Sequence, residues 1–534
     1  MSSVPDVKFD SFYRYDEMVE FLKGCQAAAG DLCKLASLVE TPEGRQVWIA
    51  TLTDPATGAP EDKPAYYVQA SVHAQEMAGT TAALRLIHTL LTAGEAGKML
   101  QEMTFYVVPR ANPDGVEYAM TTGGTIRSRN EILEKRNGLV PEDINGDGLI
   151  LNMRWEDSAG PFTEDPEDPR IMVPRRPGDE GPFYQQYQEG TVRDYDGGPL
   201  VSAVKGYDFN RNYPANWDFN TDAADHPFAQ PEIKAVGSFL LEHKNVFAGI
   251  DFHCGSQAVL RPSSTPDNDM NQADLGLIIE IGKIGEKLTG FGLMNVRDYR
   301  DPWRAPITLR GNSGDFAYFE LGISWYVIEL GNGYSSSGID IQTFFNADEE
   351  TRQRDFMRRL MEFADESEGR DVFVPWQDCE HPQLGKVQVG GMSIAATHYP
   401  YPPHMAEISA NTTKFLLEHA SWHPQLCLSN VEVAGVGEGV YRLRADVANT
   451  GRFATNVMST GIGSRSAEPV AVKLEKVEAA KIFSRPRVYE FAALGGGGGG
   501  QQMEWFVGAS PGDEITITAS HPRGGIVRER LKLP

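Results

Sequence analysis

The feature that most constrains the fold is residues 66–79, YYVQASVHAQEMAG. An apolar run that predicts a buried strand leads to His73, and Glu76 follows where the pattern becomes helical. Helices cover both faces of a mainly parallel sheet, so only the carboxyl edge stays open for a site. His73 and Glu76 can both reach one metal ion at that edge. The pair alone leaves a second interpretation equally open, in which His73 is one of eleven histidines and Glu76 merely begins a helix.

Length and composition bound the class of protein. A chain of 534 residues exceeds one ordinary core, which predicts two domains. Its 41% hydrophobic and 23% charged content is typical of a folded, soluble protein. The net charge of −25 argues against nucleic acid or an anionic membrane surface as a partner, because both need an excess of Lys and Arg.

The cysteines and the N-terminus indicate in which cellular compartment the protein is expected. Five scattered cysteines without a C-x-x-C pair predict neither a disulfide framework nor a thiolate zinc site. The polar, acidic N-terminus lacks the pattern of a signal peptide, and the chain has no apolar run of 18 residues. We therefore expect a cytoplasmic protein without a membrane span. A leader removed from the chain would instead make it secreted or periplasmic.

Strand and helix patterns alternate over most of the chain, which predicts an α/β domain with a largely parallel core. The alternation lapses at about residues 131–205, rich in Pro, Gly, Asp and Arg, which we interpret as a long surface insertion with little core of its own. From about residue 426 apolar and polar residues alternate, which is typical of strands. We expect an α/β domain at 1–425 and a separate β-sandwich at 426–534.

Four later motifs add chemistry to His73 and Glu76. Residues 112–115 form an Asn-Pro-Asp-Gly turn followed by Arg127, which alone indicates only a turn and a surface arginine. Residues 206–212, GYDFNRN, place an amide beside the fork of Arg211, a combination that grips a carboxylate. His253 ends another apolar strand. Glu329 lies within an apolar strand, where burial is costly unless the carboxylate faces a polar site.

In this order the motifs resemble the zinc metallocarboxypeptidases of the carboxypeptidase A type, over about residues 13–366. The resemblance implies an α/β/α sandwich around a mixed, largely parallel eight-stranded sheet, in agreement with the alternation of patterns. It also implies that His73, Glu76 and His253 are the ligands of one Zn²⁺ per chain. Two imidazoles and one carboxylate suit a catalytic site that keeps an open position.

The resemblance further implies a role for each remaining motif. Asp208 matches the residue that orients the first histidine ligand. Glu329 matches the general base, and Arg127 matches the donor that stabilises the oxyanion and contacts substrate. Asn210 and Arg211 match the pair that binds the terminal carboxylate of the substrate.

Two positions depart from the family pattern. Counting back without gaps from Asp315, the position where the family usually has a tyrosine over the substrate holds Ile307. Either Tyr299 or another loop residue takes that role, or the role is absent. The pocket-floor position holds Gly314, so an acid that selects basic residues is unsupported, and Arg310 in the same loop could equally favour an acidic side chain. We predict neither preference.

Asp143, Asn145 and Asp147 stand in DINGDGLI, the first half of a calcium loop. A full EF-hand would have a bidentate Glu at position twelve, where Arg154 stands; the pair 156–157 could close the site from outside that register. Ca²⁺ binding and an acidic turn that binds no ion both remain open.

The leading functional hypothesis is a zinc metallocarboxypeptidase that hydrolyses the C-terminal peptide bond of a peptide with a free terminal carboxylate. A second hypothesis keeps the metal site in a zinc amidase or deacylase of acylated amino acids or cell-wall peptides. That branch is usually shorter and lacks the 112–115 and 206–212 motifs in this form. A third hypothesis is a peptide-binding protein without turnover, against which the intact Glu329 speaks.

Overall fold

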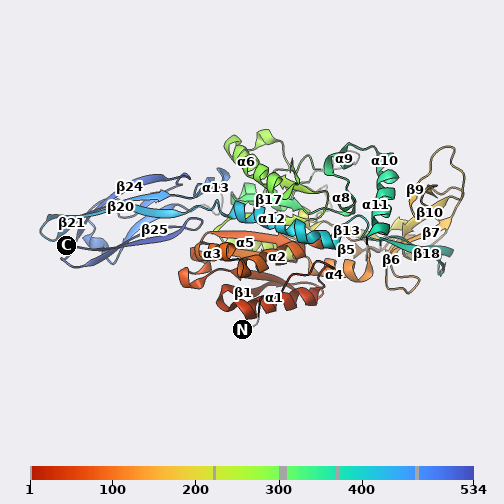
Figure 1. The fold of residues 1–534 in the computed structure, drawn as a ribbon, viewed down its shortest axis with the longest axis horizontal. Helices are drawn as coiled ribbons and strands as arrows, with labels where there is room; N and C mark the ends of the chain where they lie inside the picture. Colours follow the sequence, from red (N-terminus) through yellow and green to blue (C-terminus); the bar gives the residue numbers. More distant parts are fainter. Residues whose placement is uncertain (1–2, 220–223, 300–308, 368–371, 464–467) are drawn as a thin grey trace.

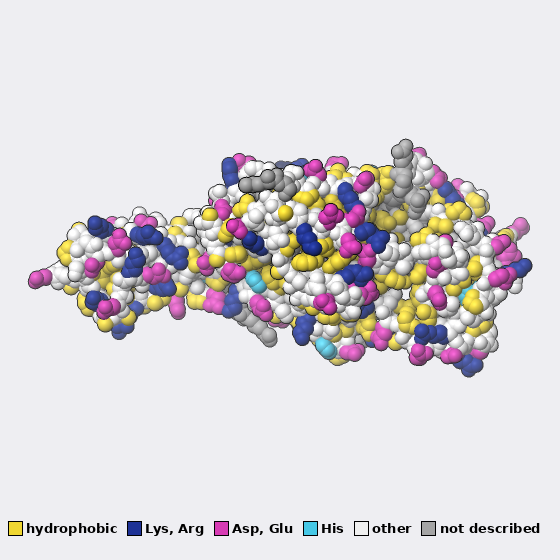
Figure 2. Space-filling view, turned by 90° about the horizontal axis from the view of Figure 1, so that it is seen from below, with side chains coloured by type: hydrophobic (Ala, Val, Ile, Leu, Met, Phe, Trp, Pro, Cys, Tyr) yellow, Lys and Arg dark blue, Asp and Glu magenta, His cyan; other side chains and the backbone are white. Residues whose placement is uncertain are grey.

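The computed structural model describes residues 3–219, 224–299, 309–367, 372–463 and 468–534. The molecule is elongated, with an α/β body in the middle and the C-terminal strands, in blue, at one end (Figure 1). On the face shown in Figure 2, acidic and basic side chains are interspersed along the molecule. Within the described residues no helix has the length and apolar character needed to cross a membrane. All five cysteines are free, as their spacing predicts.

A mixed eight-stranded sheet forms the centre of the body. Its strands are β1 (Cys33–Glu40), β2 (Gln46–Leu52), β3 (Ala65–Ala70), β4 (Thr104–Val108), β14 (Val246–His253), β15 (Ala258–Arg261), β16 (Gly292–Asn295) and β17 (Ser324–Glu329). The order is β1-β2-β4-β3-β14-β17-β15-β16. The four middle strands β4, β3, β14 and β17 are parallel, and β1, β2 and β15 pair antiparallel with neighbours. The predicted sheet is confirmed.

Two apolar cores lie on the two faces of this sheet. Side chains alternate along β3, so that Tyr66 and Val68 belong to one core and Ala65 and Tyr67 to the other. Each fully buried large apolar side chain contributes about 1.5–3 kcal/mol to folding. Helices cover both cores, which makes the body an α/β/α sandwich. They include α1 (Tyr15–Ala29), α2 (Ala78–Thr92), α6 (Gln272–Thr289) and α12 (Met405–Ala420) over the first core and α5 (Pro231–Glu242) over the second.

Local sequence explains where several helices begin. The Asn112 side chain accepts the backbone N–H of Gly115 at 3.0 Å and so caps α4 (Pro113–Thr122), whose first residue is a proline. Helix α5 likewise begins with Pro231. The remaining short α-helices of the described chain are α3 (Gly94–Glu102), α7 (Ser313–Asp315), α8 (Gly333–Ser336), α9 (Ile341–Asn346), α10 (Glu349–Gln353), α11 (Asp355–Glu366) and α13 (Thr460–Gly463).

The insertion has more structure than the sequence predicts. Its strands are β5 (Arg129–Ile132), β6 (Gly138–Pro141), β7 (Asn152–Glu156), β8 (Phe162–Glu164), β9 (Met172–Pro174), β10 (Tyr184–Gln188), β11 (Gly190–Arg193), β12 (Val201–Ser202) and β13 (Val204–Tyr207). Four of them join β18 (Phe373–His381) and β19 (Gly385–Met392) in the order β18-β19-β7-β10-β8-β9. Met153 packs with Val387 and Val389 from the distant β19, so this buried cluster of the insertion is shared with another part of the chain. Strands of two to five residues are too short to carry a clear alternation.

The C-terminal region is an all-β sandwich. Its strands are β20 (Leu426–Gly437), β21 (Val440–Asn449), β22 (Val470–Glu475), β23 (Tyr489–Phe491), β24 (Gly499–Gly508), β25 (Glu514–His521) and β26 (Gly525–Lys532). They form sheets of three and four strands around Trp505 and Leu443. The sandwich is fixed to the body by Arg523, whose guanidinium donates to the carbonyl of Leu321 at 2.6 Å. Ser459 adds a hydrogen bond from its backbone N–H to Asp274 at 2.9 Å.

Candidate metal centre

The carboxyl ends of three neighbouring parallel strands bring the centre together. His253 ends β14 and lies opposite Glu329, the last residue of β17. On the other side β14 pairs with β3, after which the chain turns through Ser71, with φ of 53°, toward His73 and Glu76. The Ser71 hydroxyl donates to the carbonyl oxygen of Glu76 at 3.1 Å and holds this turn closed. Strand register therefore gathers side chains from distant parts of the sequence.

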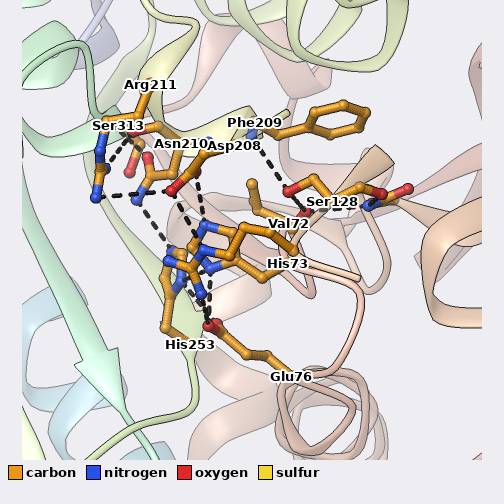
Figure 3. A network of polar contacts seen from close by, with 12 residues as sticks. Val72, His73, Glu76, Ser128, Asp208, Phe209, Asn210, Arg211, His253 and Ser313 are labelled. Atoms are coloured by element: carbon orange, nitrogen blue, oxygen red, sulfur yellow. Dashed lines mark hydrogen bonds and ion pairs between the residues drawn. The ribbon is translucent and has the colours of Figure 1, made fainter. Parts of the chain in front are cut away.

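His73, Glu76 and His253 converge on one point (Figure 3). Nδ1 of His73 lies 2.8 Å from Glu76 Oε1, and Nδ1 of His253 lies 2.8 Å from Glu76 Oε2. The two Nδ1 atoms are 3.0 Å apart. All three residues are buried, with at most 5% exposure. Their donor atoms lie within 4.8 Å of one another, the only such group of three found in the described part of the chain.

An aspartate carboxylate contacts the Nε2 atom of each imidazole. Nε2 of His73 lies 2.9 Å from Asp208 Oδ1, where the sequence predicts the orienting residue. Nε2 of His253 lies 3.1 Å from Asp251 Oδ2, a contact that the sequence reasoning missed. Asp251 stands two residues before His253 in the same strand, so both side chains lie on one face of the sheet. The spacing of two residues between Asp251 and His253 is the sequence signal that could have identified this contact.

The electrostatics of the cluster are dominated by buried charge. Burial raises the pKa of Glu76, but the imidazoles of His73 and His253 outweigh it and hold this pKa well below its usual range. Burial lowers the pKa of His253, yet Asp251 and Glu76 raise it well above its ordinary value. A buried negative charge thus attracts positive charge to this point.

The donor set fits a zinc ion. When Asp208 and Asp251 accept the Nε2–H of the two imidazoles, the lone pairs lie on Nδ1 of His73 and His253. The two Nδ1 atoms are 3.0 Å apart, so their lone pairs repel each other unless a proton or a cation lies between them. Two imidazole nitrogens and one carboxylate are a common donor set for catalytic zinc.

Glu329 is a buried carboxylate beside this group, with 7% exposure. Its Oε2 atom has no hydrogen-bond partner within the described residues. Burial, with a further contribution from the Glu76 carboxylate, raises the pKa of Glu329 to about 8. A carboxyl group with a pKa near neutrality is suited to take up and release protons.

Tyr299 also reaches the centre. Its hydroxyl oxygen accepts the backbone N–H of Ser256 at 3.1 Å. A methyl group added to Gly255 would lie 2.2 Å from that oxygen and 2.8 Å from Oε2 of Glu329. The absence of a side chain at Gly255 therefore lets the Tyr299 hydroxyl and the Glu329 carboxylate share this space. Ile307, the position that matches the family's tyrosine, lies outside the described residues.

Arg127 lies over the cluster with its side chain 47% exposed. It donates from Nη1 to Glu76 at 2.8 Å and from Nε to Asp208 at 3.2 Å. Because half of the side chain remains accessible, the guanidinium can turn toward a bound molecule. The structure thus brings Arg127 next to the predicted metal ligands.

Asn210 and Arg211 lie in the short helix η4 (Phe209–Arg211), on the same side of the cluster as Asp208 (Figure 3). The Asn210 side chain accepts the backbone N–H of Ser313 at 2.9 Å, and its Nδ2 lies 3.5 Å from Nε2 of His253. Arg211 lies 3.7 Å from Asp208. Burial raises the pKa of Asp208, but Arg211 and Arg127 outweigh it and hold the pKa well below its usual range.

The predicted calcium residues lie elsewhere, in an exposed loop. Asp143 accepts the backbone N–H groups of Gly146 and Gly148 at 2.7 and 2.9 Å. Asn145 and Asp147 accept further backbone N–H groups of the same loop. Calcium binding stays a prediction. Of the pocket residues, Gly314 is buried, and Arg310 lies 4.0 Å from Asp218 at the surface.

Comparison with known proteins identifies the family to which the chain belongs. The family model described as zinc carboxypeptidase matches residues 18–353, a span that includes all of the converging residues. The chain belongs to the zinc carboxypeptidase family. A model of a domain of unknown function matches residues 425–532 of this zinc carboxypeptidase family member.

Individual relatives are distant. A metallocarboxypeptidase A-like protein of Trichophyton verrucosum is 26% identical over 165 residues, which cover 29% of this chain and 38% of the relative. A zinc carboxypeptidase of Saccharothrix mutabilis subsp. capreolus is 26% identical over 142 residues, which cover 26% of this chain and 32% of the relative. The chain thus spans about a third of the length of these relatives. The crystal structure of carboxypeptidase A from Helicoverpa armigera matches with a TM-score of 0.40 and 16% identity, covering 67% of this chain and 73% of that one.

Proposed function

We propose that the protein is a zinc-dependent carboxypeptidase that releases the C-terminal residue of peptides. The observation that carries the proposal is the convergence of His73, Glu76 and His253 beside Glu329, whose Oε2 has no hydrogen-bond partner within the described residues. Membership of the zinc carboxypeptidase family supports it. His73, Glu76 and His253 would hold the ion, which when bound supplies Lewis acidity and lowers the pKa of a coordinated water to about 7.

Glu329 acts as the proton carrier. As a carboxylate it accepts a proton from the attacking water, and as a carboxylic acid it delivers that proton to the nitrogen of the departing amine. One group can perform both transfers because its pKa of about 8 lies close to neutral pH. Asp208 and Asp251 keep the two imidazoles in the orientation that leaves Nδ1 as the donor atom.

Arg127, Asn210 and Arg211 bind the substrate. The accessible guanidinium of Arg127 donates hydrogen bonds to the scissile carbonyl oxygen as negative charge develops there. Asn210 and Arg211 hold the terminal carboxylate, which restricts cleavage to the last residue of a chain. Buried Arg211 keeps a fixed position because the carbonyl oxygen of Asn210 accepts from its Nη1 at 2.6 Å.

Tyr299 takes the part of the tyrosine that the family pattern places at position 307. Its hydroxyl lies beside the carboxylate of Glu329, with the Gly255 backbone leaving room for both. There the Tyr299 hydroxyl donates a hydrogen bond to the substrate next to the bond that breaks. Burial and the Glu329 charge raise the pKa of Tyr299 well above its usual value, so the hydroxyl keeps its proton at neutral pH.

A peptide library digested with and without a chelator, and analysed by mass spectrometry, tests the proposal. We expect removal of single residues from the C-terminus, loss of activity on chelation and its return with Zn²⁺. Peptides with an amidated C-terminus are the matched control, because they cannot occupy the carboxylate site of Arg211. A zinc-loaded preparation that hydrolyses amidated and free peptides equally well, or neither, would contradict the proposal.

A further inference from the structure

A cavity of about 290 Å³ lies beside the metal centre and has no role in the mechanism above. Its wall combines the insertion strands β7 and β10, the helix α8 and the segment 392–398 that follows β19. Half of the lining residues come after residue 353, where the match to the family model ends. Half of the wall therefore lies outside the part of the chain that matches the family model.

Two wall residues connect the cavity to the centre. Thr125 stands two residues before Arg127, and His398 also lines the cavity. Burial lowers the pKa of His398; the charge of Arg127 lowers it further, whereas that of Glu76 raises it. The described wall residues include none from the carboxylate site of Asn210 and Arg211. Because Arg127 is assigned to the scissile carbonyl, a cavity on its side of the centre and apart from the carboxylate site would receive the part of the peptide that precedes the scissile bond.

The wall combines polar and apolar side chains, and its apolar part is adaptable. Three methionines line it, Met172, Met357 and Met392, together with the rings of Tyr334 and Trp376. Methionine side chains adjust to irregular shapes at low cost, and sulfur contacts aromatic rings favourably. The Tyr334 hydroxyl donates to Met357 Sδ at 3.2 Å, so even this polar group faces a thioether.

Charge in the wall is already neutralised. The wall includes Arg170, whose guanidinium is held by Asp168 and Asp365, both at 2.7 Å. A charged side chain that entered would lose hydration without gaining a counter-charge.

We propose that this cavity is a subsite for a large, uncharged side chain of the substrate residue that precedes the scissile bond. The inference rests on the proposed carboxypeptidase function, because the direction of the peptide follows from the carboxylate site. It assigns selectivity to the insertion and to the segment after β19. Substrates with Phe or Met at this position are favoured over those with Gly, Asp or Lys.

The test uses N-acetylated tripeptides that differ only in the middle residue, Gly, Phe, Met, Asp or Lys, and share the C-terminal residue removed fastest from the library. We expect kcat/KM of the zinc-loaded protein to be at least about tenfold higher with Phe or Met than with Gly, Asp or Lys. Met392→Trp fills the cavity and should bring the ratio of Phe to Gly close to one. Met357→Phe, a smaller change, should reduce it part of the way. The exposed Val436→Trp in the sandwich is the matched control and should keep the ratio.

Binding to the Glu329→Gln variant, measured by calorimetry, separates this inference from the proposed function. Tighter binding of the Phe peptide than of the Gly peptide, abolished by Met392→Trp, supports the subsite even if no hydrolysis is found. Equal affinity and equal kcat/KM for all five peptides would overturn the subsite and leave the carboxypeptidase function intact. Failure of every peptide to bind or react would overturn both.

Discussion

The buried cluster and the loop at residues 143–147 both carry residues that the sequence predicts as ion ligands, and the structure treats them differently. In the cluster, Glu76 contacts two imidazoles and lies beside Glu329, whose Oε2 has no partner within the described residues. In the loop, the Asp143 carboxylate accepts backbone N–H groups of its own turn. The cluster is buried, whereas the loop is half-buried to exposed.

The two sites differ in how far water and the folded chain already satisfy the hydrogen-bonding groups of their side chains. An exposed carboxylate keeps its hydration and its local hydrogen bonds, so it gains little from an ion. Buried carboxylates and imidazole lone pairs have lost water, and a cation replaces what they lost. We therefore expect tight binding at the cluster and weak binding at best in the loop.

Burial alone does not make a histidine a ligand. His419 is fully buried, and its ring nitrogens lie 2.8 Å from the hydroxyl oxygens of Tyr66 and Ser324. With only neutral partners, burial lowers its pKa to about 3. His253, next to Asp251 and Glu76, shifts in the opposite direction. The carboxylates, rather than burial, distinguish the metal centre.

The largest expected effect is that of Glu329→Gln. The amide cannot accept the proton of the attacking water, so kcat should fall by about 10²–10⁴-fold. Zinc content should stay at one per chain, because Glu329 is not among the three converging donors. Steady-state kinetics and elemental analysis measure the two quantities. Glu320→Gln, a partly exposed glutamate nine residues earlier, is the matched control, and equal activity of both variants would refute the role of Glu329.

A smaller effect is expected from Asp251→Asn. This change removes the carboxylate that orients His253, and zinc affinity should weaken by about 10–100-fold. Competition with a chromophoric chelator measures the affinity. Asp267→Asn, which removes a surface carboxylate paired with Arg261, should leave it unchanged. An affinity that does not change in Asp251→Asn would mean that the orientation of His253 is set elsewhere.

The buried, neutral His419 predicts a dependence of stability on pH. Its folded-state pKa of about 3 lies below the unfolded value of about 6.5, so the unfolded chain binds more protons between the two. Stability should be fully present above pH 6.5 and fall by up to about 1.4 kcal/mol per pH unit below it. Denaturant titration between pH 7 and 5 measures this slope. The slope should decrease in His419→Gln but persist in His88→Gln; an unchanged slope in His419→Gln would contradict the account.

The smallest effect concerns the loop at residues 143–147. If it binds Ca²⁺ with a dissociation constant near 1 mM, 10 mM Ca²⁺ should stabilise the protein by about 1.4 kcal/mol. Thermal unfolding with and without Ca²⁺ measures this, and Asp143→Asn with Asp147→Asn should abolish it. Zinc content should be unaffected by the double change. No stabilisation of the wild-type protein by Ca²⁺ would identify the loop as a plain acidic turn.

Local rules placed the side chains of the candidate centre at strand ends, and the resemblance to the zinc metallocarboxypeptidases joined them into one predicted site. His73 and His253 follow apolar runs, and Glu329 interrupts one, so the strand ends were visible in the pattern. Parallel pairing then brings these ends together without further information. Asp251 was not predicted, because a carboxylate within a strand does not by itself show which neighbouring side chain it contacts.

The insertion could not be predicted in the same way. Its strand β7 pairs with β19, more than 200 residues away, and neither side of this pairing is encoded locally. Arg354 likewise separates α10 from α11, and its buried side chain lies 3.3 Å from Asp165 in the insertion. Long-range contacts of this kind depend on the assembled fold.

Anomalous X-ray diffraction at the zinc absorption edge, on crystals of the wild-type protein, tests the central claim most directly. The account predicts one strong peak at the point shared by Nδ1 of His73, Nδ1 of His253 and the Glu76 carboxylate. A peak elsewhere, or none at this point in protein shown to contain zinc, would contradict it.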